Sequence, residues 1–246
     1  MFEVFKQTHY TSISEIKFIG GNVLSYPYWD ELVDELKKYF FKKSFFIDYR
    51  LLQFDPVKLE IFNNNDFFLT VLVDVSAIRE RIENGKLPIN QNFSYLFKIS
   101  SIEEYEIAQS IIGQFQIEAK VIPFYDGTNL SFFETYIFQY LDDIVNTAWR
   151  KNDIFAHTIL NTNHFGRFSI LSNGKIYANV TSEPVGDMKS DNIKLLINQE
   201  MKLGNSWLLT RNKILPCRDC LYKYLCPSIS HYETAIGKNN LCHVMQ

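Results

Sequence analysis

The chain has 246 residues, of which 46% are hydrophobic and 15% aromatic, and its formal net charge is −3. This length suits one large domain or a large and a small one, and the weak negative charge argues against nucleic-acid binding. No apolar run reaches the roughly 18 residues that a membrane helix needs, and the first residues do not read as a signal peptide. We therefore expect a cytoplasmic protein that binds neither nucleic acid nor membrane.

A strand followed by a helix is the repeating unit from residue 16 to about residue 145. Short apolar strands are predicted at 16–19, 45–49, 67–73, 95–99 and 116–122. Helices are predicted at 29–40, near 59–62, from Ser76 to Gly85, and from Ser101 to Gly113. Strands joined by helices pair in parallel, and five units are too few for an eight-stranded barrel. The pattern predicts an α/β fold, either an incomplete (β/α) barrel or an open parallel sheet.

The rhythm changes after residue 150. Asn173-Gly174 predicts a β-hairpin between 167–171 and 175–180, followed by a polar loop to about 190. An amphipathic helix is expected from Ile193 to Met201, closed by Gly204. We place a domain boundary here, with an α/β domain at 1–150 and a small metal-binding domain at 151–246.

The chain's four cysteines all lie in its last thirty residues, with the spacing C-x2-C-x5-C-x15-C: Cys217, Cys220, Cys226 and Cys242. Four thiolates suit either a zinc ion or an iron–sulfur cluster. In a reducing compartment metal binding is favoured over disulfides. Zinc ribbons usually pair two CxxC knuckles, and a second knuckle is missing here. Spacing alone does not choose between iron and zinc.

The segment Pro216–Ser228, with the sequence PCRDCLYKYLCPS, resembles the SPASM domain of peptide-modifying radical SAM enzymes. The resemblance implies that Cys217, Cys220, Cys226 and Cys242 hold one auxiliary [4Fe-4S] cluster. It also implies that a second auxiliary cluster is missing. Its ligand positions fall on Ser230, on Asn179 and near His164, which cannot together hold a cubane.

The N-terminal half resembles the same superfamily. Ile16–Pro27 looks like the GGEP segment, in which a glycine-rich turn, here Gly20 and Gly21, approaches the amino group of S-adenosylmethionine. Asn22-Val23 replaces the Glu-Pro pair, which removes a carboxylate acceptor. The CxxxCxxC motif that holds the radical cluster does not occur, and only about fifteen residues precede the GGEP-like strand. S-adenosylmethionine cleavage by this chain alone is therefore not expected.

Taken together, these features resemble the pseudo-radical-SAM proteins of ribosomal peptide (RiPP) maturation systems, which carry a SPASM domain without the radical cluster. The resemblance implies a non-catalytic accessory or scaffold protein that binds a precursor peptide or a radical SAM/SPASM maturase. Two alternatives stay open: one part of a split radical SAM enzyme, and a zinc-stabilised adaptor with no redox role.

Polar residues near the cysteines are secondary candidates. His231 and His243 lie close to ligand positions in sequence and could hydrogen-bond to sulfur, although surface histidines are the plainer interpretation. The segment is locally basic, which would offset the charge of a thiolate site. The basic residues are Arg211, Arg218, Lys223 and Lys238.

Overall fold

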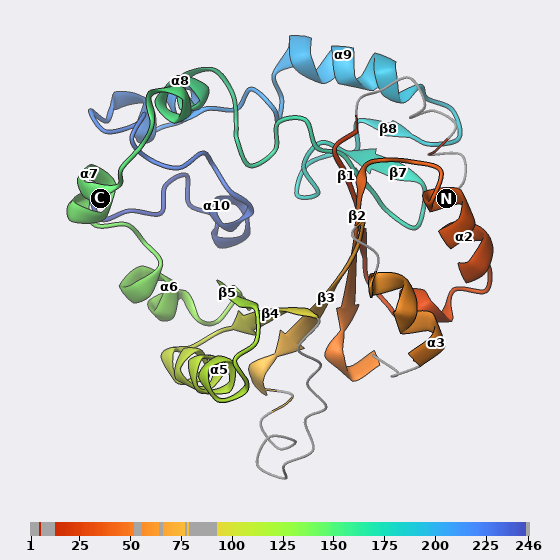
Figure 1. Ribbon diagram of the computed structural model, residues 1–246. Coiled ribbons are helices and arrows are strands. Elements are labelled where there is room, and N and C mark those ends of the chain that lie inside the picture. Colours follow the sequence, from red (N-terminus) through yellow and green to blue (C-terminus); the bar gives the residue numbers. More distant parts are fainter. Residues whose placement is uncertain are drawn as a thin grey trace. The chain divides into compact units, whose positions relative to one another are not determined.

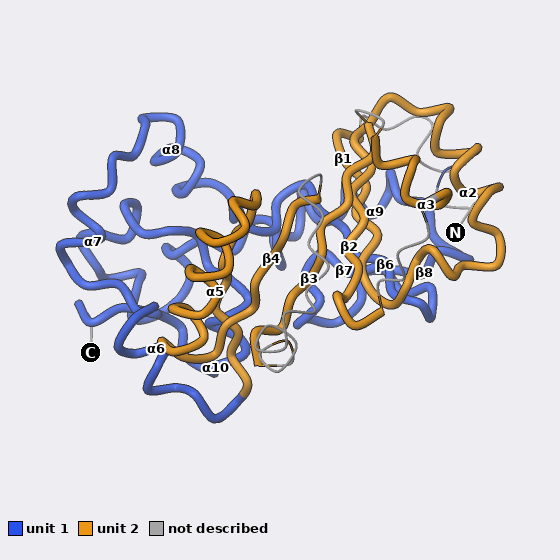
Figure 2. Tube along the Cα trace, turned by 60° about the horizontal axis from the view of Figure 1, so that its bottom comes forward, with its two compact units in different colours: residues 1–11, 127–246 blue, residues 12–126 orange. Residues whose placement is uncertain are grey.

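The computed structural model describes residues 5, 13–51, 56–63, 66–76, 78 and 93–244. The chain divides into two compact units, residues 12–126 and residues 127–246 together with 1–11 (Figure 2). This division differs from the predicted boundary between 150 and 151. Residues 127–150 belong with the cysteines because the backbone N–H of Gln139 donates to the carbonyl of Leu241, at 3.0 Å.

Residues 12–126 form an α/β unit around a parallel sheet. Within the described residues the sheet has five strands in the order β1-β2-β3-β4-β5, all parallel (Figure 1). The strands are β1 (Glu15–Ile19), β2 (Lys42–Asp48), β3 (Phe67–Asp74), β4 (Ser94–Ile99) and β5 (Ala119–Pro123). The helices are η1 (Val23–Ser25), α2 (Trp29–Leu36), η2 (Tyr49–Leu51), α3 (Pro56–Leu59), η3 (Glu60–Asn63) and α5 (Ile102–Phe115).

The sheet is open. Among the described strands, β1 and β5 each pair with one neighbour, so the predicted α/β class is confirmed in its open form, without a closed barrel. Sequential strands with right-handed crossovers place their helices on one face, and Figure 1 shows α2 and α3 together on one side of the strands.

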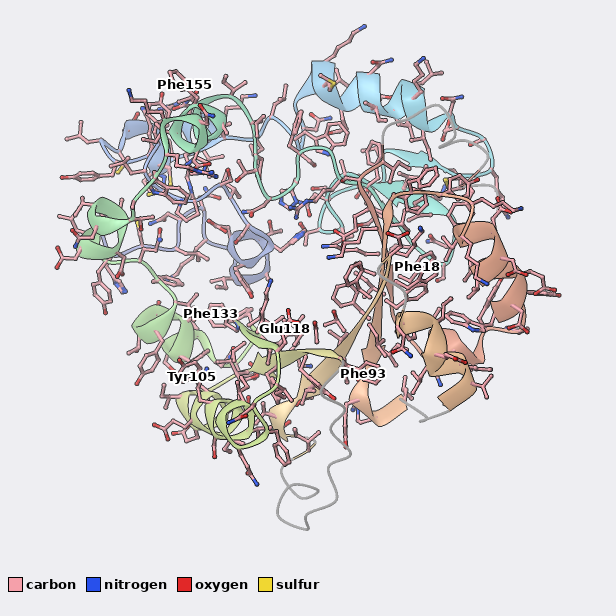
Figure 3. The ribbon with its side chains drawn as sticks, in the orientation of Figure 1. Phe18, Phe93, Tyr105, Glu118, Phe133 and Phe155 are labelled. Atoms are coloured by element: carbon pink, nitrogen blue, oxygen red, sulfur yellow. The ribbon has the colours of Figure 1, made fainter. Side chains whose placement is uncertain are left out.

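One face of the sheet is more deeply buried than the other. Along β3, Phe67, Leu69, Val71 and Val73 are buried while the residues between them are half-buried or exposed. Aromatic packing extends to the edge of the sheet, where Phe18 of β1 stacks on the next strand (Figure 3).

Helix α5 begins as predicted and ends later. The Ser101 hydroxyl accepts from the backbone N–H of Glu104, and the Glu104 carboxylate accepts from the N–H of Ser100. The predicted stop at Gly113 is wrong: the helix continues to Phe115 and ends where Gln116 adopts a left-handed conformation with φ 50°. Most of the helix predicted from Ser76 lies outside the described residues.

Residues 127–244 combine short helices with a small antiparallel sheet. The helices are α6 (Leu130–Tyr136), α7 (Leu141–Asn146), α8 (Lys151–Ile159), α9 (Ile193–Leu203), η4 (Arg211–Lys213), η5 (Cys217–Asp219) and α10 (His231–Ile236). The strands are β6 (Ser169–Ile170), β7 (Lys175–Tyr177) and β8 (Gly186–Asp187).

The predicted hairpin is present as β6 and β7, and the predicted helix as α9, capped by Gly204. The segment predicted as a loop to residue 190 contributes a third strand, β8, which pairs with β7. Alternation could not reveal it because it has only two residues. These elements enclose a small core of Ile176, Met188, Ile193 and Leu196.

Across the ranges that the structure describes, we find no helix with the length and apolar character needed to cross a bilayer.

Candidate metal centre

The first two cysteines lie on one tight turn. Cys217 opens η5, and the backbone N–H of Cys220 donates to the carbonyl of Cys217 at 3.0 Å. The turn is held from behind because the N–H of Arg218 donates to the carbonyl of Ile214 at 2.7 Å. Cys217 is buried and Cys220 is half-buried. The CxxC spacing thus places both thiols on the same short loop, as two ligands of one metal require.

The loop carrying Cys226 is anchored by residues near α8. The indole of Trp149 donates to the carbonyl of Leu225 at 2.7 Å, and the His157 ring lies 3.1 Å from the carbonyl of Tyr224. Since both carbonyls directly precede Cys226, these contacts fix the position of its backbone.

A second anchor holds the chain after Cys226. Asn161 is fully buried, and its amide donates to the carbonyl of Ile229 at 3.0 Å. Asn163 donates to the carbonyls of Ser228 and Ile229, and the N–H of Thr162 donates to the hydroxyl of Ser228. Three consecutive residues therefore hold the segment that leads from Cys226 to α10.

Cys242 comes from the far end of the unit and is held by a short parallel bridge to Gln139. The backbone N–H of His243 donates to the carbonyl of Gln139 at 3.0 Å. The ring of His243 stacks on Tyr140 with centroids 4.3 Å apart, and its Nε2 lies 2.8 Å from the carbonyl of Glu134. Through these contacts His243 anchors the segment that carries Cys242.

Helix α10 connects the last two cysteine segments. Its residue Tyr232 packs edge-on against Phe133 of α6, with centroids 5.3 Å apart (Figure 3). Ser230 is the N-cap of this helix, and its hydroxyl accepts from the N–H of Tyr232. The Glu233 carboxylate in turn accepts from the N–H of Ser230 at 2.9 Å. This reciprocal pair is a capping box.

The four thiols share one electrostatic environment. Burial raises the pKa of Cys226 to about 11; Arg211 opposes this rise, and the other three thiols add to it. Burial likewise raises the pKa of Cys217, again against Arg211, with further increases from Cys242 and Cys220. The three cysteine segments are also joined by contacts, because Arg211 donates to Cys217 Sγ and to the carbonyls of Pro227 and Asn239.

The thiols are not arranged as a complete set of metal ligands in this structure. Among the described residues, no three His, Cys, Asp or Glu side chains are positioned to hold a metal ion in this arrangement. The donor set still fits a thiolate-bound metal, because four cysteines on three anchored segments supply the full complement of sulfur ligands. A bound metal would draw the sulfurs nearer to one another, because its positive charge would replace the thiol protons and offset the repulsion between thiolates.

Arg211 is a buried cation that contacts one of these thiols. Its guanidinium is buried, donates to Cys217 Sγ at 3.6 Å and forms an ion pair with Glu233 at 2.6 Å. Burial alone would lower the pKa of Arg211, but Glu233 and Cys217 raise it. Sequence reasoning named Arg211 only as one of several basic residues and missed Glu233, although the pattern Ser-x-x-Glu at 230–233 signals the capping box.

Positions that would carry a second cluster have other partners. Ser230 caps α10, and the Asn179 side chain accepts from the N–H of Thr181 at 3.0 Å. His164 is buried, and its ring packs edge-on against His231 with centroids 4.5 Å apart. The contact that the structure gives the His231 ring is thus with the His164 ring.

Gly20 and Gly21 lie at the carboxyl end of β1, outside the cysteine-bearing unit. Both have positive φ, 106° and 60°, which explains why glycine is used there. Asn22, which replaces the glutamate of the GGEP pattern, uses its side chain to accept from the N–H of Leu24 at 3.1 Å. The turn is therefore satisfied by its own residues.

Comparison of the chain with protein-family models, curated proteins and solved structures found no match.

Proposed function

We propose that this chain is an accessory protein of ribosomal peptide maturation, and that its cysteine-bearing unit is a SPASM-like domain holding one [4Fe-4S] cluster. The observation that carries the proposal is the buried Arg211, which donates to Cys217 Sγ, to the carbonyl next to Cys226 and to a carbonyl three residues before Cys242. When bound, such a cluster supplies a covalent link between loops and a site for one electron.

A structural need for metal supports this proposal. The segments between Ser206 and Cys242 contain short 3-10 turns and one helix of six residues, with few buried apolar side chains. Small, loop-rich regions of this kind gain much of their stability from a metal or a disulfide. A reducing, cytoplasmic setting would keep the four thiols available for metal.

An accessory role is favoured over radical catalysis by the composition of the site residues. The 246 residues contain no cysteine besides these four, so they hold no CxxxCxxC motif. Asn22 also lacks the carboxylate of the GGEP pattern and is engaged with Leu24. We expect no cleavage of S-adenosylmethionine by this chain, and the assay is formation of 5′-deoxyadenosine after anaerobic reconstitution.

The α/β unit is the proposed binding part. Among the described strands of its sheet, β1 and β5 are the outermost, and an extended peptide can add to such an edge through main-chain hydrogen bonds. A precursor peptide or a segment of a maturase fits this mode. Titration of the purified chain with a candidate precursor peptide would test it, with backbone amide shifts expected in an edge strand.

Metal analysis is the first experiment. Protein purified without oxygen is expected to contain about four irons per chain and to absorb broadly in the visible range. Cys220→Ser should lose most of the metal, whereas Leu221→Ala, its 91% exposed neighbour, should keep it. One zinc per chain without iron would instead support the zinc-stabilised adaptor, and a chain with neither metal would refute both.

A further inference from the structure

Arg211 is a buried cation whose partners come from separate parts of the cysteine-bearing unit. Only 7% of its surface is exposed. A buried charge is tolerated when it is paired and hydrogen-bonded, because otherwise the loss of hydration is not offset. The identity of its partners therefore indicates what the charge is for.

The guanidinium contacts every segment that bears a cysteine. Nη1 donates to Cys217 Sγ at 3.6 Å and to the carbonyl of Asn239 at 3.4 Å. Nε donates to the carbonyl of Pro227 at 3.0 Å. Cys217 belongs to the CxxC turn, Pro227 directly follows Cys226, and Asn239 lies three residues before Cys242. One planar group thus fixes the spacing of three segments.

Glu233 orients this group and partly neutralises it. Its Oε1 accepts from Arg211 Nη2 at 2.6 Å, while its Oε2 accepts from the N–H of Ser230. The carboxylate is 5% exposed and belongs to α10, so the helix cap and the arginine are mechanically linked. Arginine suits this task because its fork of donors has fixed geometry.

The charge of Arg211 also reaches the sulfurs. Four thiolates around a cubane or a zinc ion leave roughly two negative charges uncompensated. A guanidinium donating to one sulfur offsets part of this charge at short range.

We propose that Arg211 is the positioning residue of the thiolate centre, and that its charge, balanced by Glu233, sets the centre's reduction potential and its hold on metal. This inference rests on the proposed metal-binding function. It adds to that function a specific electrostatic role for an Arg–Glu pair.

The test compares the two members of the pair, because charge and structure predict different results. The reduced cluster carries one more negative charge, so a nearby cation stabilises it. Arg211→Met is therefore expected to lower the midpoint potential, and Glu233→Gln, which leaves the guanidinium uncompensated, to raise it. A purely structural role predicts no such opposition. Shifts in the same direction, or no shift in either variant, would overturn the proposal.

Matched variants control for general effects. Arg150→Met removes an arginine whose side chain is 87% exposed and should leave the potential unchanged. Arg211→Lys restores the charge without the fork, so it should return the potential towards the wild-type value. If Arg211→Met fails to fold, the upward shift in Glu233→Gln still decides the matter.

Metal retention provides a second measurement that applies to iron and zinc alike. A chelator should strip Arg211→Met on the order of tenfold faster than wild type, since residues that support ligands typically change affinity by that factor or more. Equal rates for Arg211→Met and Arg150→Met would overturn the role of Arg211 while leaving the metal site intact. A wild-type chain that takes up neither metal would refute the proposed function itself.

Discussion

His164 makes the cysteine-bearing unit sensitive to acid. Its side chain is buried and 4% exposed, and among the described atoms Nε2 is buried without a hydrogen-bond partner. Burial lowers the pKa of His164 to about 4, helped by the nearby charges of His231 and Arg167 and opposed by Glu233. The folded state thus holds the ring neutral where the unfolded chain would protonate it.

The sign and size of the effect follow from linkage. The pKa of His164 in the folded state lies below its ordinary value of 6.5. The contribution of neutral His164 to the free energy of unfolding is therefore present above pH 6.5 and is lost as the pH falls towards 4. Between pH 7 and pH 5 the His164 side chain gains about 0.7 proton in the unfolded state and about 0.1 in the folded state. The free energy of unfolding should therefore fall by about 2 kcal/mol from this group alone.

Urea unfolding followed by circular dichroism at pH 7, 6 and 5 tests this expectation. His164→Phe keeps an aromatic ring against His231 but cannot take a proton, so its loss of stability over this range should be smaller by about 2 kcal/mol. Phe165→Leu, on the same turn, adds no ionisable group and should retain the wild-type pH dependence. An equal pH dependence in wild type and His164→Phe would refute the reasoning.

Three further substitutions test local features of the fold by urea unfolding. Ser230→Ala removes the N-cap of α10 and should destabilise the cysteine-bearing unit by about 1 kcal/mol. Thr234→Ala, at an exposed position of the same helix, should not destabilise it. Equal losses in the free energy of unfolding for the two variants would argue against the cap. Gly21→Ala should destabilise the α/β unit by about 1 kcal/mol because φ is +60°. Gly113→Ala, inside α5 with open space around it, should stabilise that unit by up to ~1 kcal/mol, so the two glycines should respond with opposite sign.

Much of the α/β unit could be predicted because its signals are local. The strand around Phe67–Val73 is apolar except for Thr70, and the start of α5 is marked by Ser101 and Glu104. The end of α5 could not be predicted in the same way. Gly113 has ordinary helical geometry, and Gln116, a residue with no special preference for positive φ, ends the helix.

The membership of residues 127–150 was beyond sequence reasoning for a different reason. Helices α6 and α7 continue the strand–helix rhythm, so pattern alone assigns them to the first domain. Their place is set by backbone contacts to a segment about a hundred residues later, such as Gln139 to Leu241 and His243. A pairing of two extended backbones leaves no trace in the side chains that form it.

Cysteine spacing predicts a candidate ligand set, which stays a prediction, but it does not predict the contacts that hold the cysteine segments in place. The CxxC turn is local, whereas the anchors of Cys226 come from Trp149, His157 and Asn161, on segments that carry no motif. Each contributes a side-chain hydrogen bond to a backbone carbonyl, so any residue sequence on the receiving side would serve. Such supports become visible only when the chain is folded.

Ser230 bears both on the absence of a second cluster and on the support of the proposed first one. Where the SPASM pattern has a ligand of a second cluster, Ser230 caps α10 and accepts the N–H of Tyr232. That helix presents Glu233 to Arg211, and Arg211 donates to Cys217. A thiol at 230 would be a weaker acceptor for the cap and so would loosen the helix that orients Arg211. The residue that removes a second cluster from the proposed site therefore also supports the first.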